Sequence, residues 1–231
     1  MIIHKGFSEQ WDDVYIRNEQ NTSWPWSDLV SLVHRYGKNI INKNHPKVLE
    51  LGCGPGANID FLLSLNFSYF AIEGSKEIVG KLHNKYPSLI KQITIGDFSN
   101  KESFPYFDFF DLIVDRAALT HNNEKSIESS LSLILNSLLP GGFFIGVDWF
   151  SVNHSDSSLG ETGGDLNTRN KITSGQFSGV GNVHFSDEAH LRKLFLEFDI
   201  LLLEEKVLKK HEPKNEHQFS SWNIVARRRI N

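Results

Sequence analysis

A short glycine-rich stretch carries the residues with the clearest chemical meaning. An apolar segment that ends at Leu51 runs directly into Gly52, Gly54 and Gly56, and a helical pattern follows. Glycines at this spacing let the backbone turn sharply and let a ligand approach where a Cβ would collide. Glu73 lies seventeen residues after Gly56, at the end of the next apolar run, where a carboxylate is able to accept both hydroxyls of a ribose. These residues indicate a nucleoside-containing cofactor.

The same stretch also fits a loose dinucleotide pattern, because Gly52, Gly54 and Ala57 satisfy G-x-G-x-x-G/A. Two neighbouring residues argue against a pyrophosphate ligand. Glu50 places a carboxylate two positions before the first glycine, and Pro55 removes a backbone N–H that a phosphate would use. Both features favour a cofactor with a cationic end, and a dinucleotide oxidoreductase is kept as a distant alternative.

The glycine turn and the motifs that follow it resemble those of the class I S-adenosylmethionine-dependent methyltransferases. The first motif of that family is acidic-x-Gly-x-Gly-x-Gly, its second ends in an acidic residue that grips the ribose, and its third places an Asp beside the adenine. These three motifs are matched in order by Glu50 with Gly52, Gly54 and Gly56, by Glu73, and by Asp97. Residues 110–121 match a fourth motif and residues 139–143 match the turn before the fifth strand.

The resemblance covers roughly residues 46 to 150 by motif and the last 40 residues by topology. It implies an α/β fold, a Rossmann-like three-layer sandwich whose mostly parallel seven-stranded sheet ends in an antiparallel hairpin. It also implies S-adenosyl-L-methionine as cofactor and S-adenosyl-L-homocysteine as product. The cofactor site is then expected to include Glu50, Gly52, Cys53, Gly54, Gly56, Asn58, Glu73, Gly74, Ser75, Gly96, Asp97, Phe98, Asp115, Arg116, Ala117, Trp11, Tyr15 and Trp26.

An aromatic cluster precedes the first expected strand, with Trp11, Tyr15, Trp24 and Trp26 in an otherwise polar segment. This spacing resembles the N-terminal aromatic lid of small-molecule methyltransferases, including the thiopurine methyltransferase type, which closes over cofactor and substrate. Such a lid suits a sulfonium, because each aromatic face attracts a cation by about 0.5 to 2 kcal/mol. The alternative is that the rings fasten an N-terminal helix to the sheet.

Four residues are candidates for a catalytic role. Asp115, beside Arg116, ends the central strand, where open α/β sheets gather their ligands, although it could instead cap the strand end. Asp148 ends the next strand and could orient a substrate hydroxyl or amine. His121 and His184 could take a proton from the incoming nucleophile, because imidazole titrates near neutrality; the alternative for each is a surface or packing role.

No metal site is expected. Cys53 is the single cysteine and lies in the glycine turn as a small filler, and no His, Asp or Glu pair at i, i+4 stands out. His154 has no sequence neighbour that would support a site. The basic run at residues 227–229 is too short to be a nucleic-acid arm.

Short apolar runs alternate with helical periods from residue 46 onward, a pattern typical of parallel strands joined by crossover helices. Strands are expected at Lys47–Leu51, Tyr69–Ile72, Lys91–Ile95, Phe110–Asp115 and Gly142–Trp149. Helices are expected at Asn58–Leu65, Lys76–Lys85 and Lys125–Leu139, the last one ending at Pro140-Gly141-Gly142.

The pattern changes at residue 151. Residues 151–186 are polar and contain six Gly without a sustained period, which suggests a long loop acting as a lid or a substrate platform. Ser186 is expected to cap a helix that runs to about Leu196. Strands at Asp199–Leu208 and near Ser221–Arg227 follow with no helix between them, so they must pair antiparallel.

Composition bounds the remaining choices. At 231 residues, 39% hydrophobic and a net charge of -4, the chain is expected to form one domain without a positive field for a polyanion. Its parts are an aromatic lid with helices (1–45), a cofactor-binding core (46–150), a substrate-side insertion (151–186) and a last helix with the terminal hairpin (187–231). The single cysteine, the lack of a leader-like N-terminus and the absence of an apolar run of ~20 residues predict a cytoplasmic protein with no membrane contact.

The sequence therefore predicts an S-adenosylmethionine-dependent methyltransferase that modifies a small molecule at O, N or S, works as a monomer or homodimer and has no nucleic-acid partner. Two alternatives stay open. One is a macromolecular methyltransferase acting on protein or RNA, and the other is a non-catalytic S-adenosylmethionine-binding partner subunit.

Overall fold

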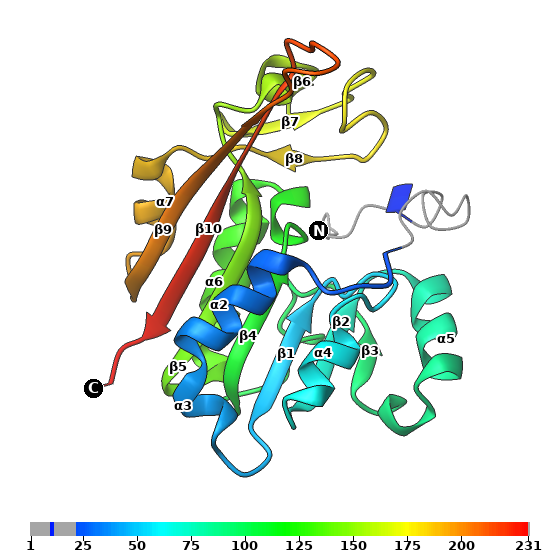
Figure 1. The fold of residues 1–231 in the computed structure, drawn as a ribbon, viewed down its shortest axis with the longest axis vertical. Coiled ribbons are helices and arrows are strands. Elements are labelled where there is room, and N and C mark those ends of the chain that lie inside the picture. Colours follow the sequence, from blue (N-terminus) through cyan, green and yellow to red (C-terminus); the bar gives the residue numbers. More distant parts are fainter. Residues whose placement is uncertain (1–9, 12–21, 231) are drawn as a thin grey trace.

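A seven-stranded sheet forms the centre of the computed structural model, which describes residues 10–11 and 22–230 (Figure 1). The strand order is β3-β2-β1-β4-β5-β10-β9. In chain order these strands are β1 (Lys47–Leu51), β2 (Ser68–Glu73), β3 (Ile93–Ile95), β4 (Phe110–Arg116), β5 (Leu138–Phe150), β9 (Phe198–Lys209) and β10 (Gln218–Arg228).

The first five strands run parallel, whereas β10 lies antiparallel between β5 and β9. Crossover helices join β1 to β2, β2 to β3 and β4 to β5, whereas residues 96–109 join β3 to β4 without a helix. The short connection after β9 allows only an antiparallel return. The predicted α/β fold with a mostly parallel seven-stranded sheet and a terminal antiparallel hairpin is confirmed.

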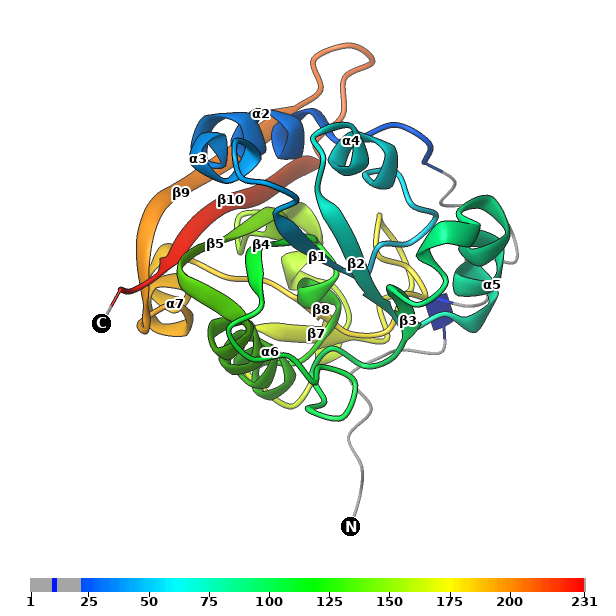
Figure 2. The same ribbon diagram turned by 90° about the horizontal axis from the view of Figure 1, so that it is seen from below.

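Helices cover both faces of the sheet (Figure 2). One face carries α2 (Ser27–Tyr36), α3 (Lys38–Ile41), α4 (Ile59–Ser64) and α5 (Lys76–Lys85), and the other carries α6 (Glu124–Ser137) and α7 (Glu188–Leu194). Alternating side chains of β1 enter the two cores: Val48 packs on the α2–α5 side, while Leu49 and Leu51 pack on the α6–α7 side. Because both faces are covered, the strand reads as a continuous apolar run.

Two predicted boundaries are corrected by the structure. Helix α6 ends at Ser137, and β5 already begins at Leu138, so the expected stop at residues 140–142 lies within the strand. The pairing of β4 with β5 shifts register here, and Gly141 has a φ of +78°, which places the glycines in a strand irregularity. The cap of α7 is Asp187 and not Ser186, because the Asp187 side chain accepts a hydrogen bond from the His190 N–H.

The polar segment 151–186 is more ordered than a loop. It begins with a 3-10 turn, η3 (Ser155–Ser158), and forms a three-stranded sheet from β6 (Glu161–Thr162), β7 (Thr168–Asn170) and β8 (Val183–His184). A separate apolar cluster joins this segment to the main sheet, with Phe177, Val183 and Phe185 packing beside Ala117 and Phe150. The segment therefore lies over the carboxyl ends of β4 and β5.

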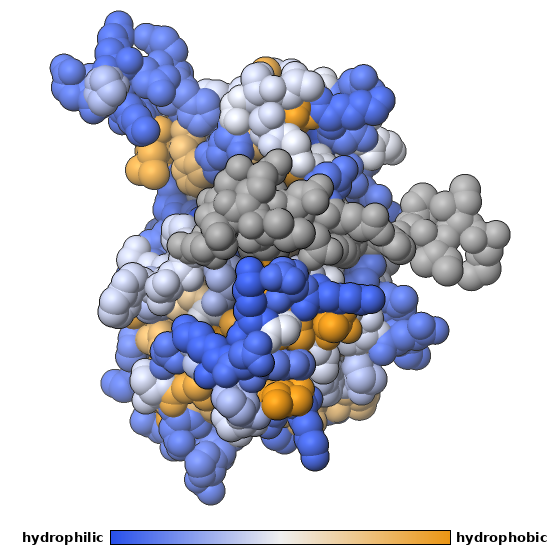
Figure 3. All heavy atoms as spheres, turned by 90° about the vertical axis from the view of Figure 1, so that its right-hand side faces the viewer, coloured by the Kyte–Doolittle hydropathy of each residue, from blue (hydrophilic) through white to orange (hydrophobic). Residues whose placement is uncertain are grey.

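In the part of the chain that the structure describes, no helix has the length and apolar character to cross a membrane. The face that bears α5 has a mainly hydrophilic surface, and its hydrophobic residues form several separate groups (Figure 3).

Candidate functional site

The glycine turn joins the carboxyl end of β1 to α4, as the sequence predicts. Gly52, Gly54 and Gly56 all have positive φ values, of 61°, 50° and 84°. At Gly52 a Cβ would also lie 2.4 Å from the Cβ of Ala118, which follows the end of β4. Left-handed backbone and this close approach together require glycine here.

Glu73, at the end of β2, is held against this turn. The backbone N–H of Gly54 donates to Glu73 Oε2 at 2.8 Å, and the N–H of Ser75 donates to Oε1 at 2.9 Å. The side chain is 3% exposed, so these bonds fix a carboxylate at the adjoining ends of β1 and β2. This is the place that the sequence predicts for a ribose-binding acid.

Glu50 is a second buried carboxylate beside the turn. Tyr69 donates its hydroxyl to Oε2 at 2.6 Å, and the Asn58 amide donates to Oε1 at 2.7 Å. Burial raises the pKa of Glu50 to about 7, although both hydrogen bonds oppose this rise. Because both donors are neutral, the site favours a cation close to Glu50.

A cavity of about 370 Å³ opens in front of the turn. Its volume falls in the range of small-molecule sites. The residues that were predicted to bind the cofactor and do line this cavity are Trp11, Trp26, Glu50, Gly52, Cys53, Gly54, Asn58, Glu73, Gly74, Phe98, Arg116 and Ala117. One strand–turn–helix unit and its neighbouring strand ends thus supply much of one wall.

The cavity continues beyond these residues into a part that sequence analysis did not assign. Aromatic, amide and aliphatic side chains from distant segments form its far wall: Asn122, Phe150, Gln176, Phe177, Val180 and Phe219. Three of them lie in the segment 151–186, which was predicted to be a lid or substrate platform; the candidate named in that segment was His184 and none of these three. The sequence carries no local signal for Phe150 or Phe219, which end β5 and begin β10.

His121, a predicted catalytic residue, lies on this far side and lines the cavity. Its Nδ1 is 3.3 Å from the carbonyl oxygen of Asn182, and its ring meets the Trp11 ring edge-on at 4.7 Å. A carbonyl only accepts, so Nδ1 carries the hydrogen. Burial lowers the pKa of His121 to about 4, so the ring is neutral near pH 7 and Nε2 keeps its lone pair.

Arg116 is held beside the cavity by two contacts. Its guanidinium carbon lies 3.6 Å from the centre of the Trp26 ring, and its NH2 group donates to Asp148 Oδ2 at 3.3 Å. Burial lowers the pKa of Arg116, while Asp148 opposes that shift; the group stays protonated. Among the described residues, Arg116 is the one Lys or Arg side chain that lines the cavity.

Comparisons with known proteins agree with this geometry. Residues 48–142 match the sequence model of a methyltransferase domain family. An uncharacterised methyltransferase of Bacillus cytotoxicus is 24% identical over 148 residues, which cover 64% of this chain and 68% of that protein. Residues 48–142 therefore form a methyltransferase domain.

Solved structures show the same fold as this methyltransferase. An S-adenosylmethionine-dependent methyltransferase from Methanosarcina mazei matches with a TM-score of 0.65 and 18% identity, covering 90% of this chain and 100% of that one. A putative methyltransferase of Haloferax volcanii, solved in complex with the Trm112 methyltransferase activator, has a TM-score of 0.62 and 15% identity, covering 96% and 99%. The methyltransferase-domain match together with these structural likenesses implies use of S-adenosylmethionine.

Asp115 of the methyltransferase does not reach the cavity, contrary to its predicted catalytic and cofactor-binding roles. It is fully buried; its Oδ1 accepts the N–H groups of Ala118 and Leu119 at 3.1 Å, and its Oδ2 accepts the Trp149 indole N–H at 2.7 Å. Burial raises the pKa of Asp115 to about 7, against the effect of these hydrogen bonds. The alternative of a strand-end cap describes its position.

Other predicted cofactor residues lie behind the cavity wall. Gly56, Ser75, Gly96 and Asp97 are not among the lining residues. Asp97 Oδ1 accepts the N–H and hydroxyl of Ser99, at 2.9 and 2.7 Å, which turns that oxygen toward its own loop. Tyr15 lies outside the described residues.

Asp148 and His184, the other predicted catalytic residues, also lie outside the cavity lining. Asp148 bonds Arg116 and accepts from Lys206 Nζ at 2.7 Å, so it positions a cavity residue. His184 is fully buried, with Nδ1 2.9 Å from the Thr168 hydroxyl and Nε2 3.0 Å from Nε2 of His190. Burial lowers the pKa of His184 to about 4, which fits a packing role.

Proposed function

We propose that this methyltransferase modifies a small molecule held in the far part of the cavity. The observation that carries the proposal is the wall of aromatic side chains, which come from four separate parts of the chain: Trp11 and Trp26, Phe150, Phe177 and Phe219. Such a wall excludes water and suits a compact, partly apolar acceptor better than an extended polymer. The net charge of -4 also gives RNA no general attraction.

The residues at the glycine turn fit S-adenosylmethionine. When bound, this cofactor supplies an electrophilic methyl group on a cationic sulfur. Glu73 would accept the ribose hydroxyls, Glu50 would compensate the positive methionine amine, and the backbone of Gly52 and Gly54 would allow close approach. The buried carboxylate of Glu50, which has only neutral hydrogen-bond donors, supports this assignment because a nearby cation would stabilise its charged form.

His121 would orient the acceptor. Its Nε2 lone pair is able to accept a hydrogen bond from an O–H, N–H or S–H group on the acceptor, which points the nucleophile's own lone pair elsewhere. The low pKa of His121 means that it takes the proton only as the acceptor becomes positively charged during methyl transfer. Arg116 is the residue that would meet a carboxylate, either on the cofactor or on the acceptor.

A metabolite screen tests the proposal. Purified protein and S-adenosylmethionine are incubated with a low-molecular-weight cell extract and, separately, with protein and RNA fractions, and S-adenosylhomocysteine is measured. Turnover with the small-molecule fraction is expected. Turnover confined to RNA or protein would overturn the proposal in favour of a macromolecular acceptor, and cofactor binding without turnover in any fraction would favour a partner subunit.

A variant pair then tests the role of His121. With an acceptor in hand, His121→Gln should lower kcat by about 100-fold or more, since a positioned proton acceptor contributes 10²–10⁴-fold. His211→Gln, on an exposed histidine of the β9–β10 connection, serves as the matched control. Equal kcat values for the two variants would remove His121 from the reaction.

We propose that the catalytic unit is a monomer or homodimer in the cytoplasm. Size-exclusion chromatography with light scattering on the purified chain distinguishes monomer from homodimer. The activator complex of the Haloferax volcanii protein makes a helper subunit the alternative.

A further inference from the structure

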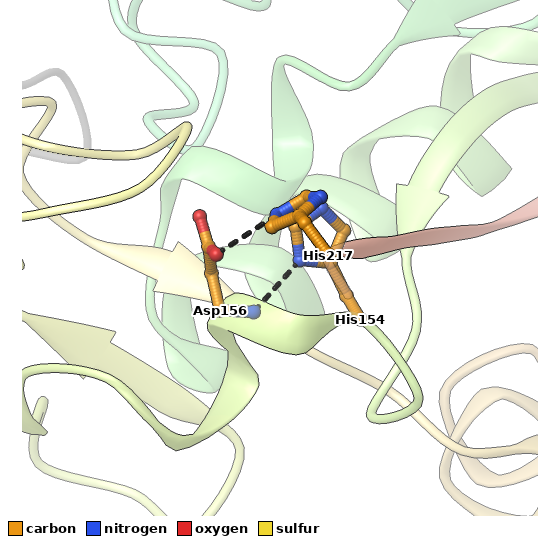
Figure 4. Close-up of side chains that lie close together, drawn as sticks. All are labelled: His154, Asp156 and His217. Atoms are coloured by element: carbon orange, nitrogen blue, oxygen red, sulfur yellow. Dashed lines mark hydrogen bonds and ion pairs between the residues drawn. The ribbon is translucent and has the colours of Figure 1, made fainter. Parts of the chain in front are cut away.

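A cluster of three potential metal ligands lies outside the cavity lining (Figure 4). His154 precedes the 3-10 turn η3, Asp156 lies within it, and His217 ends the connection between β9 and β10. One ligand atom from each residue lies within 4.8 Å of the other two. His154 is 1% and Asp156 2% exposed, whereas the His217 side chain is 33% exposed. Sequence analysis found no supporting neighbour for His154, because its partner His217 is 63 residues away in the chain.

The hydrogen bonds of this cluster bring its three side chains together. His154 Nδ1 accepts the backbone N–H of Asp156 at 3.0 Å, so its one lone pair would exchange this bond for a bond to the ion, while the buried Nε2 has no hydrogen-bond partner among the described residues. His217 Nε2 lies 3.0 Å from Asp156 Oδ1. Two ligand atoms bonded to one tetrahedral Zn²⁺ at about 2.0–2.1 Å lie about 3.3 Å apart, so the pair needs only a small shift to hold an ion in place of the shared hydrogen.

The carboxylate of Asp156 is fixed by the cavity wall. Its second oxygen, Oδ2, accepts the backbone N–H of Gln176 at 2.7 Å. At Gly175 a Cβ would meet that same oxygen at 2.5 Å, so the glycine allows the chain to pass directly over the carboxylate. Gln176 and Phe177 line the cavity. Asp156 would therefore bind the ion while its Oδ2 holds Gln176 in the cavity wall.

The two segments that supply the ligands are already in contact. The N–H of Gln218 donates to the Ser155 hydroxyl at 2.8 Å, and the Gln218 amide donates to the carbonyl of Asn153 at 2.8 Å. These bonds set His217 opposite η3 without help from a metal. The ligands are consequently arranged in advance, which lowers the cost of binding an ion.

We propose that His154, Asp156 and His217 bind a divalent transition-metal ion, with Zn²⁺ as the best match, that clamps the β9–β10 connection to the cavity wall. Two imidazoles and one carboxylate suit zinc and its first-row neighbours, whereas Ca²⁺ and Mg²⁺ prefer oxygen ligands alone. The exposed side of His217 leaves room for water as a fourth ligand. This site is independent of the proposed methyl acceptor.

Metal titration of the whole chain tests the proposal. Protein without an affinity tag is treated with a chelator, desalted, and titrated with ZnCl₂ by calorimetry and with CoCl₂ by visible absorption. One equivalent of Zn²⁺ per chain and the intense absorption of tetrahedral Co²⁺ are expected. His217→Gln keeps a donor for Asp156 but loses the imidazole, and its affinity for Zn²⁺ should fall about tenfold to a hundredfold.

Three further variants make the result specific. His154→Asn keeps a side-chain acceptor for the Asp156 N–H and should weaken binding as His217→Gln does, so either variant suffices if the other fails to fold. His211→Gln and His190→Gln remove histidines outside the cluster and should bind zinc as wild type does. Zinc should also raise the thermal unfolding temperature of wild type and of these controls, but not of the cluster variants. Absence of saturable binding to wild type, or equal affinity in all variants, would overturn the proposal.

Discussion

The substitution Glu73→Gln tests the cofactor site most directly. Each oxygen of this carboxylate accepts one backbone N–H, from Gly54 at 2.8 Å and from Ser75 at 2.9 Å. An amide has one accepting oxygen and one NH₂ group, so one of the two N–H groups loses its acceptor whichever way Gln is turned. The ribose would also lose one of its two acceptors.

The expected magnitude follows from these bonds. A hydrogen bond to a charged group is worth about 1.5–3 kcal/mol, so the loss of one such bond to the ribose should weaken cofactor binding about tenfold to 150-fold. Binding of S-adenosylhomocysteine is measured by calorimetry, since it shares the ribose and lacks a reactive methyl group. A urea melt of the same sample confirms that the variant is folded under the conditions of the titration.

Glu77→Gln is the matched control. Glu77 lies on α5, four residues from where Glu73 ends β2, and its exposed carboxylate pairs with half-exposed Lys81 at 3.2 Å. This variant should bind S-adenosylhomocysteine as wild type does, because exposed ion pairs contribute little. A dissociation constant for Glu73→Gln within about twofold of this control would show that the ribose is held elsewhere and refute the assignment.

Three more variants address buried charges around the cavity. Burial raises the pKa of Glu50 from 4.5 to about 7, so the folded protein keeps a proton that the unfolded chain releases, and the stability due to this group falls as pH rises between these values. In urea melts the unfolding free energy of Glu50→Gln minus that of wild type should therefore rise by on the order of 3 kcal/mol from pH 4.5 to 7; a flat difference would contradict the raised pKa. Asp115→Asn should lower the unfolding free energy by roughly 1–3 kcal/mol, because an NH₂ group would face a backbone N–H or the Trp149 indole; unchanged stability would contradict this structural role. Arg116→Lys keeps the charge but loses the planar contact with Trp26, and the affinity for the cofactor or the acceptor, measured as Kd and KM, should drop about tenfold; no change in either constant would mean that Arg116 contacts neither ligand.

The sheet was predictable because each of its signals is local. The apolar run at Lys47–Leu51 predicts β1 to the residue, and the helical period at Lys76–Lys85 predicts α5 equally well. The expected stop at residues 140–142 was wrong because Pro and Gly end isolated helices, whereas here β4 lies alongside and pairing with it carries β5 through the glycines. Tertiary pairing of this kind has no trace in the local sequence.

The two sides of the cavity also differ in whether local sequence predicts their residues. Gly52, Gly54 and Glu73 come from one strand–turn–helix unit and the next strand end, so their spacing in the sequence predicts that they meet. Phe177 and Phe219 reach the cavity from a Gly-rich segment and from the start of β10. An aromatic residue in such places is as easily core as substrate wall, and only the folded chain separates these roles.

The predicted catalytic carboxylates lie at the strand ends where the sequence places them, but neither lines the cavity. Asp115 and Asp148 do stand at the carboxyl ends of β4 and β5, where ligands gather. Asp115, however, accepts the N–H groups of Ala118 and Leu119, at the start of the 3-10 turn that carries His121. A carboxylate that accepts backbone N–H groups three and four residues later in the chain has the same sequence pattern as one that faces a ligand.

Asp148 likewise supports another residue: it accepts a hydrogen bond from the guanidinium of Arg116, which lies over the Trp26 ring. Its φ of 57° and the φ of 58° at Ala117 put both strand ends in the left-handed region, which costs about 1 kcal/mol or more at each non-glycine residue. The hydrogen bonds of Asp115 and Asp148 offset that cost and hold His121 and Arg116 at the cavity. Neutralising either carboxylate should therefore disturb the position of the side chain that it supports.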